Sequence, residues 1–357
     1  MTTETKKFKL IVSLDGGGMK GLMTLFILKY LEKTLGVDIC SKADLLCGTS
    51  TGGILAFAKM RNLSNEELET IYLDMGKIIM PFSCTNIFED FSISSTKKYK
   101  EQLLKYFPGN IMDFCTEKKG FVVSCYKPLF SKSHYEPFIF SNYENKKRKG
   151  VSGREIVNIP VNDAIRATSG VPLLFQLPKY NEMEFMDGGV LYNNPVKLCF
   201  NESRQMFGDE NVFVVLSFGT GHYKKNIPPK SPELNKTSSP AAMFKKKLME
   251  GIKTIESTKL SATSTNLNSM LKTIKSNVFD SHKTHLDAKR DFSFSPSNIN
   301  YFRFDPIISK KYSLNDCSKD SIAQMRQDVD QYLSKEKIVK RIDELKSILI
   351  EIGIIPK

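Results

Sequence analysis

Two short motifs near the N-terminus bring together residues that could carry out acyl transfer at a serine. The first, Gly48-Thr49-Ser50-Thr51-Gly52, has the Gly-x-Ser-x-Gly pattern of a nucleophile elbow. In such an elbow the chain turns so sharply from strand to helix that glycines must flank the serine, and the hydroxyl is left exposed. The pattern predicts that Ser50 is a nucleophile.

The second motif, Asp15-Gly16-Gly17-Gly18-Met19-Lys20-Gly21, offers what a serine nucleophile needs next. It lies before a helix-like segment, and the first N–H groups of a helix have no partner within the helix. These groups carry the positive end of the helix dipole and can point at a developing oxyanion. We therefore expect Gly16, Gly17 and Gly18 to form an oxyanion hole.

The same glycine run is open to a second interpretation, because Gly16-x-Gly18-x-x-Gly21 also satisfies the fingerprint of dinucleotide-binding folds. Asp38 lies close to the spacing expected for the acidic residue of that fingerprint. However, a dinucleotide site needs neither Gly17 nor a Gly-x-Ser-x-Gly motif one strand–helix unit later. The phosphate-binding P-loop is excluded, because Leu22 stands where that motif requires lysine.

A serine nucleophile also needs a base, and none of the four histidines has an obvious catalytic setting: His134, His222, His282 and His285. The spacing of the last two suits metal ligands, but their polar surroundings lack the glutamate of a zinc hydrolase motif, so we expect no metal site. A carboxylate is the better base. Asp187 follows a strand-like run and precedes Gly188-Gly189, so its side chain would emerge at a tight turn. Taken alone, Asp-Gly-Gly indicates only a β-turn, and it is the other motifs that make Asp187 the candidate base.

The elements that must position these residues alternate between strand-like and helical patterns over residues 8 to about 222. This alternation is typical of an α/β domain with a largely parallel sheet. The clearest strands are expected over residues 9–14, 44–47, 121–125 and 212–218. Helices are expected over 22–35 and from Gly53 onward, and both begin apolar almost all round, which predicts that they are buried against the sheet.

Four sequence blocks, taken in order, resemble those of the patatin-like phospholipases. They are the Asp-Gly-Gly-Gly-x-Lys-Gly run at 15–21, the Gly-x-Ser-x-Gly run at 48–52, Ala167-Thr168-Ser169 with Pro172 and Phe175, and Asp187-Gly188-Gly189 with Asn193-Asn194-Pro195. Weaker resemblance extends to residues 216–221 and 301–304. One block could arise by chance, but four in this order are very hard to explain otherwise.

The resemblance implies a lipid acyl hydrolase with a Ser-Asp dyad in place of a triad, in which Ser50 is the nucleophile and Asp187 the base. It also implies a three-layer α/β/α fold with a central mixed, largely parallel sheet, similar to the catalytic domain of cytosolic phospholipase A2. No metal or other cofactor is needed for this chemistry. Lys20 stands where the family carries Lys or Arg, and with Thr49 and Thr51 it is an expected substrate contact.

A lone aspartate with its ordinary pKa of about 3.9 is a weak base for a serine hydroxyl. The site must therefore compensate. Burial that raises the carboxyl pKa, a short Ser–Asp hydrogen bond and the oxyanion hole are the expected means.

Composition indicates a globular protein, and its charge clusters suit anionic lipid surfaces or nucleic acid, although any single cluster is expected to be a solvated surface. Of 357 residues, 41% are hydrophobic, and the seven cysteines form no C-x-x-C pair and are expected to be reduced thiols. The net charge of +13 includes lysine-rich clusters at 146–149 and 245–247, which favour anionic surfaces. The N-terminus leaves no room for a signal peptide, and no apolar run approaches the roughly 20 residues that span a bilayer.

We therefore expect a cytoplasmic protein, peripheral to membranes, whose partners are membrane phospholipids or glycerolipids met through transient surface contact. Nucleic acid is not an expected partner. Some family members are switched on by other molecules, so an unidentified regulatory ligand is also expected.

The chain is expected to divide into three regions. Residues 8–222 form the catalytic core, and residues 223–300, rich in Lys, Ser, Asn and Pro, form a cap or insertion. Residues 301–357 supply a strand and one or two terminal helices that complete the same domain. Two segments are the expected membrane contacts: the apolar run 78–82 and the helically spaced apolar residues beside lysines in 243–255.

The leading hypothesis is a phospholipase A-type hydrolase that forms an acyl-serine intermediate on glycerophospholipids or related glycerolipids. One alternative is a nucleotide-binding oxidoreductase that uses Gly16-x-Gly18-x-x-Gly21. The other is a catalytically silent lipid-binding module, against which the intact Ser50, Asp187 and glycines argue.

Overall fold

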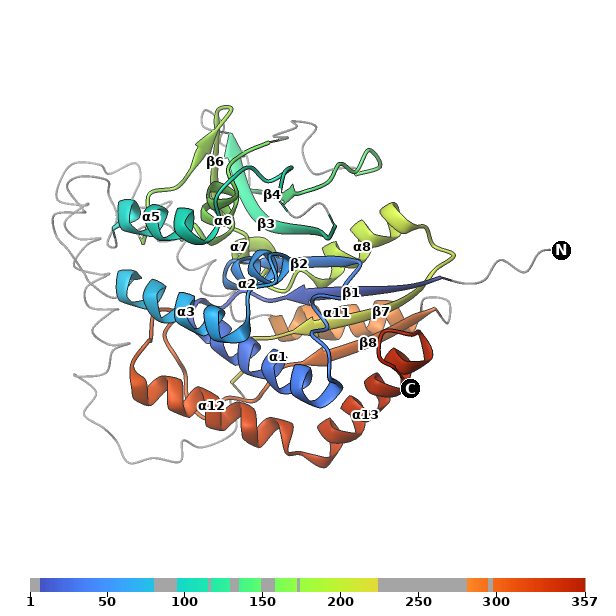
Figure 1. Ribbon diagram of the computed structural model, residues 1–357. Coiled ribbons are helices and arrows are strands. Elements are labelled where there is room, and N and C mark those ends of the chain that lie inside the picture. Colours follow the sequence, from blue (N-terminus) through green and yellow to red (C-terminus); the bar gives the residue numbers. More distant parts are fainter. Residues whose placement is uncertain are drawn as a thin grey trace.

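In the computed structural model, an eight-stranded sheet is covered by helices on both faces (Figure 1). The strand order is β5-β6-β3-β2-β1-β7-β8, and β4 pairs with β3 off this path. The structure describes residues 7–79, 95–114, 117–128, 135–148, 158–171, 174–223, 281–294 and 298–356.

The sheet is mixed and largely parallel, as predicted. From β3 through β2, β1 and β7 to β8, each neighbouring pair is parallel. The β3–β4, β3–β6 and β5–β6 pairs are antiparallel. The strands are β1 (Phe8–Leu14), β2 (Leu45–Thr49), β3 (Lys119–Pro128), β4 (Glu136–Ser141), β5 (Lys179–Tyr180), β6 (Met183–Asp187), β7 (Val212–Phe218) and β8 (Ile299–Phe304).

The helices form the two outer layers. One layer contains α1 (Gly21–Leu35), α2 (Thr51–Met60), α3 (Asn65–Ile79), α5 (Thr96–Tyr106), α6 (Val161–Ser169), α12 (Lys319–Leu333) and α13 (Glu336–Glu351). The other contains α8 (Val196–Phe207) and α11 (Ser281–Ser293). Two short elements carry loops of the site: the 3₁₀ helix η1 (Gly18–Lys20) and α7 (Gly189–Tyr192).

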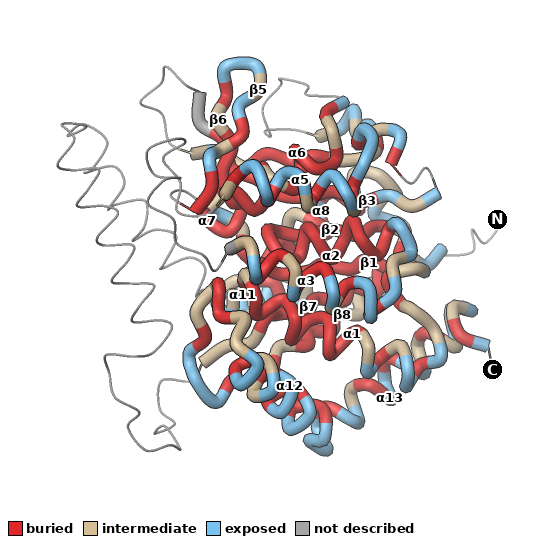
Figure 2. The backbone as a smooth tube through the Cα atoms, turned by 60° about the vertical axis from the view of Figure 1, so that its left-hand side comes forward, coloured by how far each residue is buried: buried red, intermediate tan, exposed pale blue. Residues whose placement is uncertain are grey.

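Two hydrophobic cores lie between the layers because successive side chains of a strand point to opposite faces of the sheet. On β1, Leu10 and Val12 join the core of the α1 layer, whereas Ile11 joins the core beside α8 and α11. Figure 2 shows buried residues running through the central strands and the helices next to them, with exposed residues on the outer sides of α12 and α13. The expected three-layer α/β/α fold is therefore confirmed.

The expectation that the two helices following the glycine motifs are buried is also confirmed. Every residue of α2 is buried, as is every residue of α1 from Gly21 to Leu28. The C-terminal region contains one strand and two helices, β8, α12 and α13.

Several expected features lie outside the described residues, among them 243–255, the lysines at 245–247 and residues 80–82 of the apolar run. Within the expected cap region, α11 contributes Ala288 and Phe292 to the core that also holds α8. Among the residues that the structure describes, no helix has both the length and the apolar character needed to cross a membrane.

Candidate active site

Two strands bring Ser50 and Asp187 together by ending at neighbouring positions of β3. β2 runs parallel to β3 and ends at Thr49, which pairs with Val123. β6 runs antiparallel to β3 and ends at Asp187, which pairs with Ser124. Along these residues β4 pairs with the opposite edge of β3. β2 and β6 therefore lie on the same edge of β3, and their carboxyl ends meet.

Ser50 occupies a strained turn between β2 and α2. Its φ of 54° and ψ of −122° form a backbone conformation that non-glycine residues rarely adopt. The flanking glycines allow the close packing that holds this turn. A Cβ on Gly48 would lie 2.1 Å from the Gly52 carbonyl oxygen, and a Cβ on Gly52 would lie 2.2 Å from that of Leu14.

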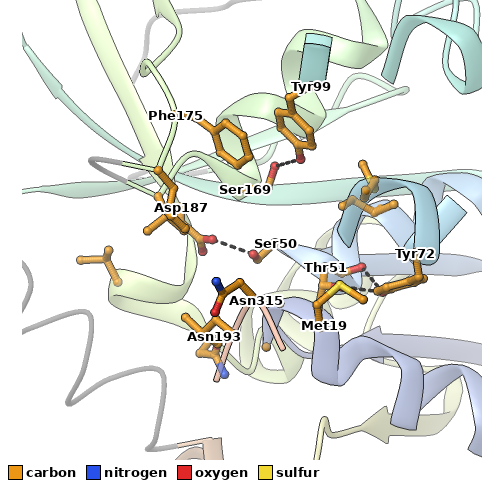
Figure 3. Close-up of a pocket in the computed structure, with 18 residues that line it drawn as sticks. Met19, Ser50, Thr51, Tyr72, Tyr99, Ser169, Phe175, Asp187, Asn193 and Asn315 are labelled. Atoms are coloured by element: carbon orange, nitrogen blue, oxygen red, sulfur yellow. Dashed lines mark hydrogen bonds between the residues drawn. The ribbon is translucent and has the colours of Figure 1, made fainter. Parts of the chain in front are cut away.

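The Ser50 hydroxyl donates a hydrogen bond of 2.6 Å to Oδ2 of Asp187 (Figure 3). Oδ1 of Asp187 accepts a second bond of 2.7 Å from the Gly189 N–H. Only 8% of Ser50 and 6% of Asp187 are exposed. Burial raises the pKa of Asp187 to about 6, against the opposing effect of the hydrogen bonds from Ser50 and Gly189. A carboxylate in this setting is a stronger base than an exposed one.

Thr168, at the end of α6, forms hydrogen bonds both with the turn that holds Ser50 and with the turn that follows Asp187. Its Oγ1 accepts a 2.9 Å bond from the Ser50 N–H and donates to the carbonyl oxygen of Val123. Its own carbonyl accepts a 3.2 Å bond from the Gly188 N–H. The sequence marks Thr168 only as a member of the third motif block, and gives no sign of this positioning role.

The glycine run places two free N–H donors beside Ser50. Gly16 donates to the Asn193 carbonyl at 2.9 Å, so its N–H is already satisfied. The Gly17 and Gly18 N–H groups have no acceptor within the described parts of the chain, and both residues line the same pocket as Ser50. Gly18 has a φ of 59°, and a Cβ there would lie 2.2 Å from the Leu314 carbonyl oxygen.

A buried ion pair between Arg303 and Asp15 holds the start of the glycine run in place. Arg303 on β8 donates to both carboxylate oxygens of Asp15, at 2.9 and 2.7 Å, and also to Ser217 and Asp305. Burial raises the pKa of Asp15 to about 6, although Arg303 acts to lower it. The sequence indicated Arg303 only as part of a weakly matching segment, so its contact with Asp15 was missed.

The pocket above Ser50 and Asp187 has mainly apolar walls. Tyr99 stacks on Phe175 with ring centres 4.3 Å apart, and its hydroxyl shares a 2.7 Å hydrogen bond with that of Ser169 (Figure 3). Most of the other walls come from aliphatic side chains, which suit an apolar ligand. They are Met19, Ile54, Met75, Val171, Leu174, Val190 and Leu314.

The three expected substrate contacts lie in different places. Thr51 lines the pocket, and its hydroxyl is hydrogen bonded to that of Tyr72. Thr49 is fully buried and donates to the Tyr192 carbonyl at 2.7 Å, outside the pocket lining. Lys20 is also buried and outside this lining, and burial lowers its pKa against the opposing effect of nearby Asp305 and Asp15.

The three described histidines are not among the residues that line this pocket, and His134 lies outside the described residues. In the described part of the chain, one group offers three possible metal ligands whose atoms lie within 4.8 Å of one another: His222, His282 and Asp305. Asp305 already accepts bonds of 3.1 Å from both Arg303 and His222. A guanidinium on this carboxylate competes with a metal ion for it.

Asp38, the acidic residue of the dinucleotide interpretation, has another partner in the structure. Its Oδ2 lies 3.0 Å from the Nζ of Lys59, a buried lysine of α2, and its Oδ1 accepts a hydrogen bond from the Cys40 N–H. Asp38 therefore anchors Lys59 and its own loop.

Comparisons with known proteins show similarity to phospholipases. The family model described as patatin-like phospholipase matches residues 12–200. Phospholipase A I of Arabidopsis thaliana is 27% identical over 273 residues, which cover 59% of this chain and 20% of that protein. Calcium-independent phospholipase A2-gamma of Oryctolagus cuniculus is 23% identical over 357 residues, covering 96% of this chain and 41% of that protein.

A shorter relative, the cGAMP-activated phospholipase of Pseudomonas aeruginosa, is 26% identical over 230 residues, which cover 59% of this chain and 62% of that protein. The matches thus span less than half of the first two relatives and about three fifths of the third.

Proposed function

Because the chain belongs to the patatin-like phospholipase family, we propose that it is a lipid acyl hydrolase of the phospholipase A type. Its substrates would be glycerophospholipids or related glycerolipids. The observation that carries the proposal is the 2.6 Å hydrogen bond from Ser50 to Asp187 beside an apolar pocket. The three relatives described above are named as phospholipases, which supports the proposal.

In the proposed reaction, Ser50 Oγ attacks the ester carbonyl while Asp187 accepts the hydroxyl proton. Asp187 then gives that proton to the leaving alcohol, and an acyl-serine remains. Water attacks the acyl-serine by the same route and releases the fatty acid. The Gly17 and Gly18 N–H groups would stabilise the oxyanion in both steps, whereas Gly16 would hold the loop through Asn193.

Asp187 is suited to act without a histidine because of its surroundings. Its raised pKa of about 6 leaves it mostly ionised at neutral pH, yet makes it more basic than an exposed aspartate. The Gly189 N–H holds one carboxylate oxygen, so the other stays directed at Ser50.

The acyl chain would lie against the apolar walls around Phe175 and Leu174. We further propose a cytoplasmic location with transient contact at membrane surfaces, and the division into regions 8–222, 223–300 and 301–357. The regulatory ligand expected from the resemblance stays a prediction.

Mass spectrometry of products from a mixed-lipid extract tests the proposed function. Wild type should release free fatty acids and leave lysolipids or partial glycerides, and Ser50→Ala should not. Equal fatty acid release by Ser50→Ala would contradict the proposal.

Two further experiments test the alternatives. Labelling of Ser50 by a fluorophosphonate separates an active enzyme from a silent lipid-binding module. Calorimetry with NAD(P)H, expected to show no binding, tests the oxidoreductase alternative.

A further inference from the structure

A second pocket lies beside the edge strand β8, between α11 and α13, and has a volume of about 310 Å³. Figure 1 shows these three elements next to one another. The polar side chains that line the pocket come from all three elements: His285, Lys289 and Ser293 from α11, Tyr301 and Arg303 from β8, and Lys337 and Arg341 from α13.

The spacing of these residues explains why they meet. Residues four apart lie on one face of a helix, and residues two apart lie on one face of a strand. Two hydrogen bonds hold the elements in place. Arg341 donates from Nη2 to the Tyr301 carbonyl at 3.0 Å, and a ring nitrogen of His285 lies 2.9 Å from the Tyr301 hydroxyl oxygen.

Arg303 is neutralised by Asp15 and Asp305, but three other cations of the pocket lining have no such acidic partner. No carboxylate is among its described lining residues, and Lys289, Lys337 and Arg341 form no ion pair with any described residue. One lysine outside the pocket lining, on the same helix as Lys337, does have an acidic partner. Lys340 pairs with Glu336 on α13 at 2.6 Å. The unpaired cations therefore face a common cavity.

Two arginines that line the pocket each have a buried Nε–H donor without an acceptor. Arg303 is only 6% exposed, and its Nη atoms are taken by Asp15, Ser217 and Asp305, but its Nε has no hydrogen-bond partner. The Nε of Arg341 is likewise buried and without a partner. Unsatisfied buried donors are costly, so an acceptor that reached either Nε would be stabilising.

We propose that this pocket binds the phosphate group of an anionic ligand. A phosphate offers several acceptor oxygens to guanidinium and ammonium donors, and charge-assisted bonds of this kind are among the strongest. Phe292 and Ile299 give the rest of the ligand an apolar wall. The site is separate from Ser50 and does not depend on the proposed hydrolase activity.

The proposed phosphate group can belong to two kinds of ligand, a water-soluble phosphate compound or a phosphorylated lipid headgroup. Calorimetry with pyrophosphate at constant ionic strength probes the first. Co-sedimentation with phosphatidylcholine vesicles, with and without phosphatidylinositol phosphate, probes the second. The vesicle experiment uses a Ser50→Ala background so that no lipid is hydrolysed.

The decisive comparison uses two charge-matched double variants. Lys289→Gln with Lys337→Gln removes two pocket cations, whereas Lys283→Gln with Lys340→Gln removes the same charge from the same helices outside the pocket lining. We expect the pocket variant to bind at least one of the two probes roughly tenfold more weakly than the control variant does.

Two outcomes would overturn the proposal. One is the absence of binding to both pyrophosphate and phosphatidylinositol phosphate. The other is an equal loss in the two double variants, which would assign the binding to the overall positive charge. Neither outcome bears on fatty acid release, so it would leave the proposed function intact.

Discussion

Ser50 Oγ and Asp187 Oδ2 lie 2.6 Å apart although 137 positions separate the two residues in the chain. They meet because β2 and β6 approach along one edge of β3 from opposite directions and end beside Val123 and Ser124. The glycine run follows β1, the next strand of the sheet. Ser50, Asp187 and the N–H donors of Gly17 and Gly18 are therefore all placed by the carboxyl ends of strands.

The raised pKa of Asp187 predicts how activity depends on pH. A base must be deprotonated, so kcat/KM should fall as pH drops through about 6. An exposed aspartate would give a fall near pH 4 instead. The measurement is a pH–rate profile on an uncharged water-soluble ester, which avoids changes in vesicle charge. A profile that stays flat down to about pH 4 would contradict the assignment of Asp187 as the base.

Burial of Asp187 also predicts a pH-dependent cost in stability. Its pKa is higher in the folded protein than the ordinary value of 3.8, so its contribution to folding is most favourable below about pH 4 and is lost as pH rises through about 6. Asp187→Asn keeps the Gly189 contact without the buried charge. We compare the free energy of unfolding of the variant with that of wild type at each pH. Between about pH 4 and above pH 6, this difference should shift in favour of the variant by on the order of 1–3 kcal/mol.

Urea unfolding of wild type and Asp187→Asn at acidic and mildly alkaline pH measures this change. If the stability difference between the two proteins is the same at both pH values, the carboxyl pKa is not raised by folding.

A pair of glycine variants tests the proposed oxyanion hole. Gly18 and Gly36 both have positive φ, 59° and 73°, but a Cβ on Gly18 would meet the Leu314 carbonyl oxygen, whereas one on Gly36 meets nothing within 4 Å. Gly18→Ala should therefore displace the N–H donor and lower kcat by about 10²–10³-fold. Gly36→Ala, with the same backbone strain, should lower stability and leave kcat close to that of wild type. Similar kcat losses in the two variants would contradict this role for Gly18.

The local patterns of the sequence were sufficient for the central elements of the fold. The expected strand 212–218 matches β7 residue for residue, and 9–14 falls short of β1 by one residue. Ser50 and Asp187 could be proposed as site residues because each lies in a glycine-rich turn whose steric demands leave a signature in the sequence. For Asp187 the other motifs were needed as well, since Asp-Gly-Gly alone indicates only a turn.

Other features depend on tertiary contacts that no local pattern records. Arg303 contacts Asp15 across 288 positions, and Thr168 contacts Ser50 across 118. The motif also could not predict the direction in which a side chain points. Thr49 directly precedes Ser50, yet it ends β2 and its hydroxyl bonds to the Tyr192 carbonyl rather than facing the pocket. The Gly16 N–H is likewise taken by Asn193, a contact between distant loops.

The central claim, hydrolysis of lipid esters by Ser50 with Asp187 as its base, is tested most directly by fatty acid release from phosphatidylcholine vesicles. Asp187→Asn is the decisive variant, because asparagine preserves the shape of the site and removes only the base. Its rate should fall by about 10³-fold or more, as should that of Ser50→Ala. A rate within about tenfold of wild type in Asp187→Asn would contradict the dyad.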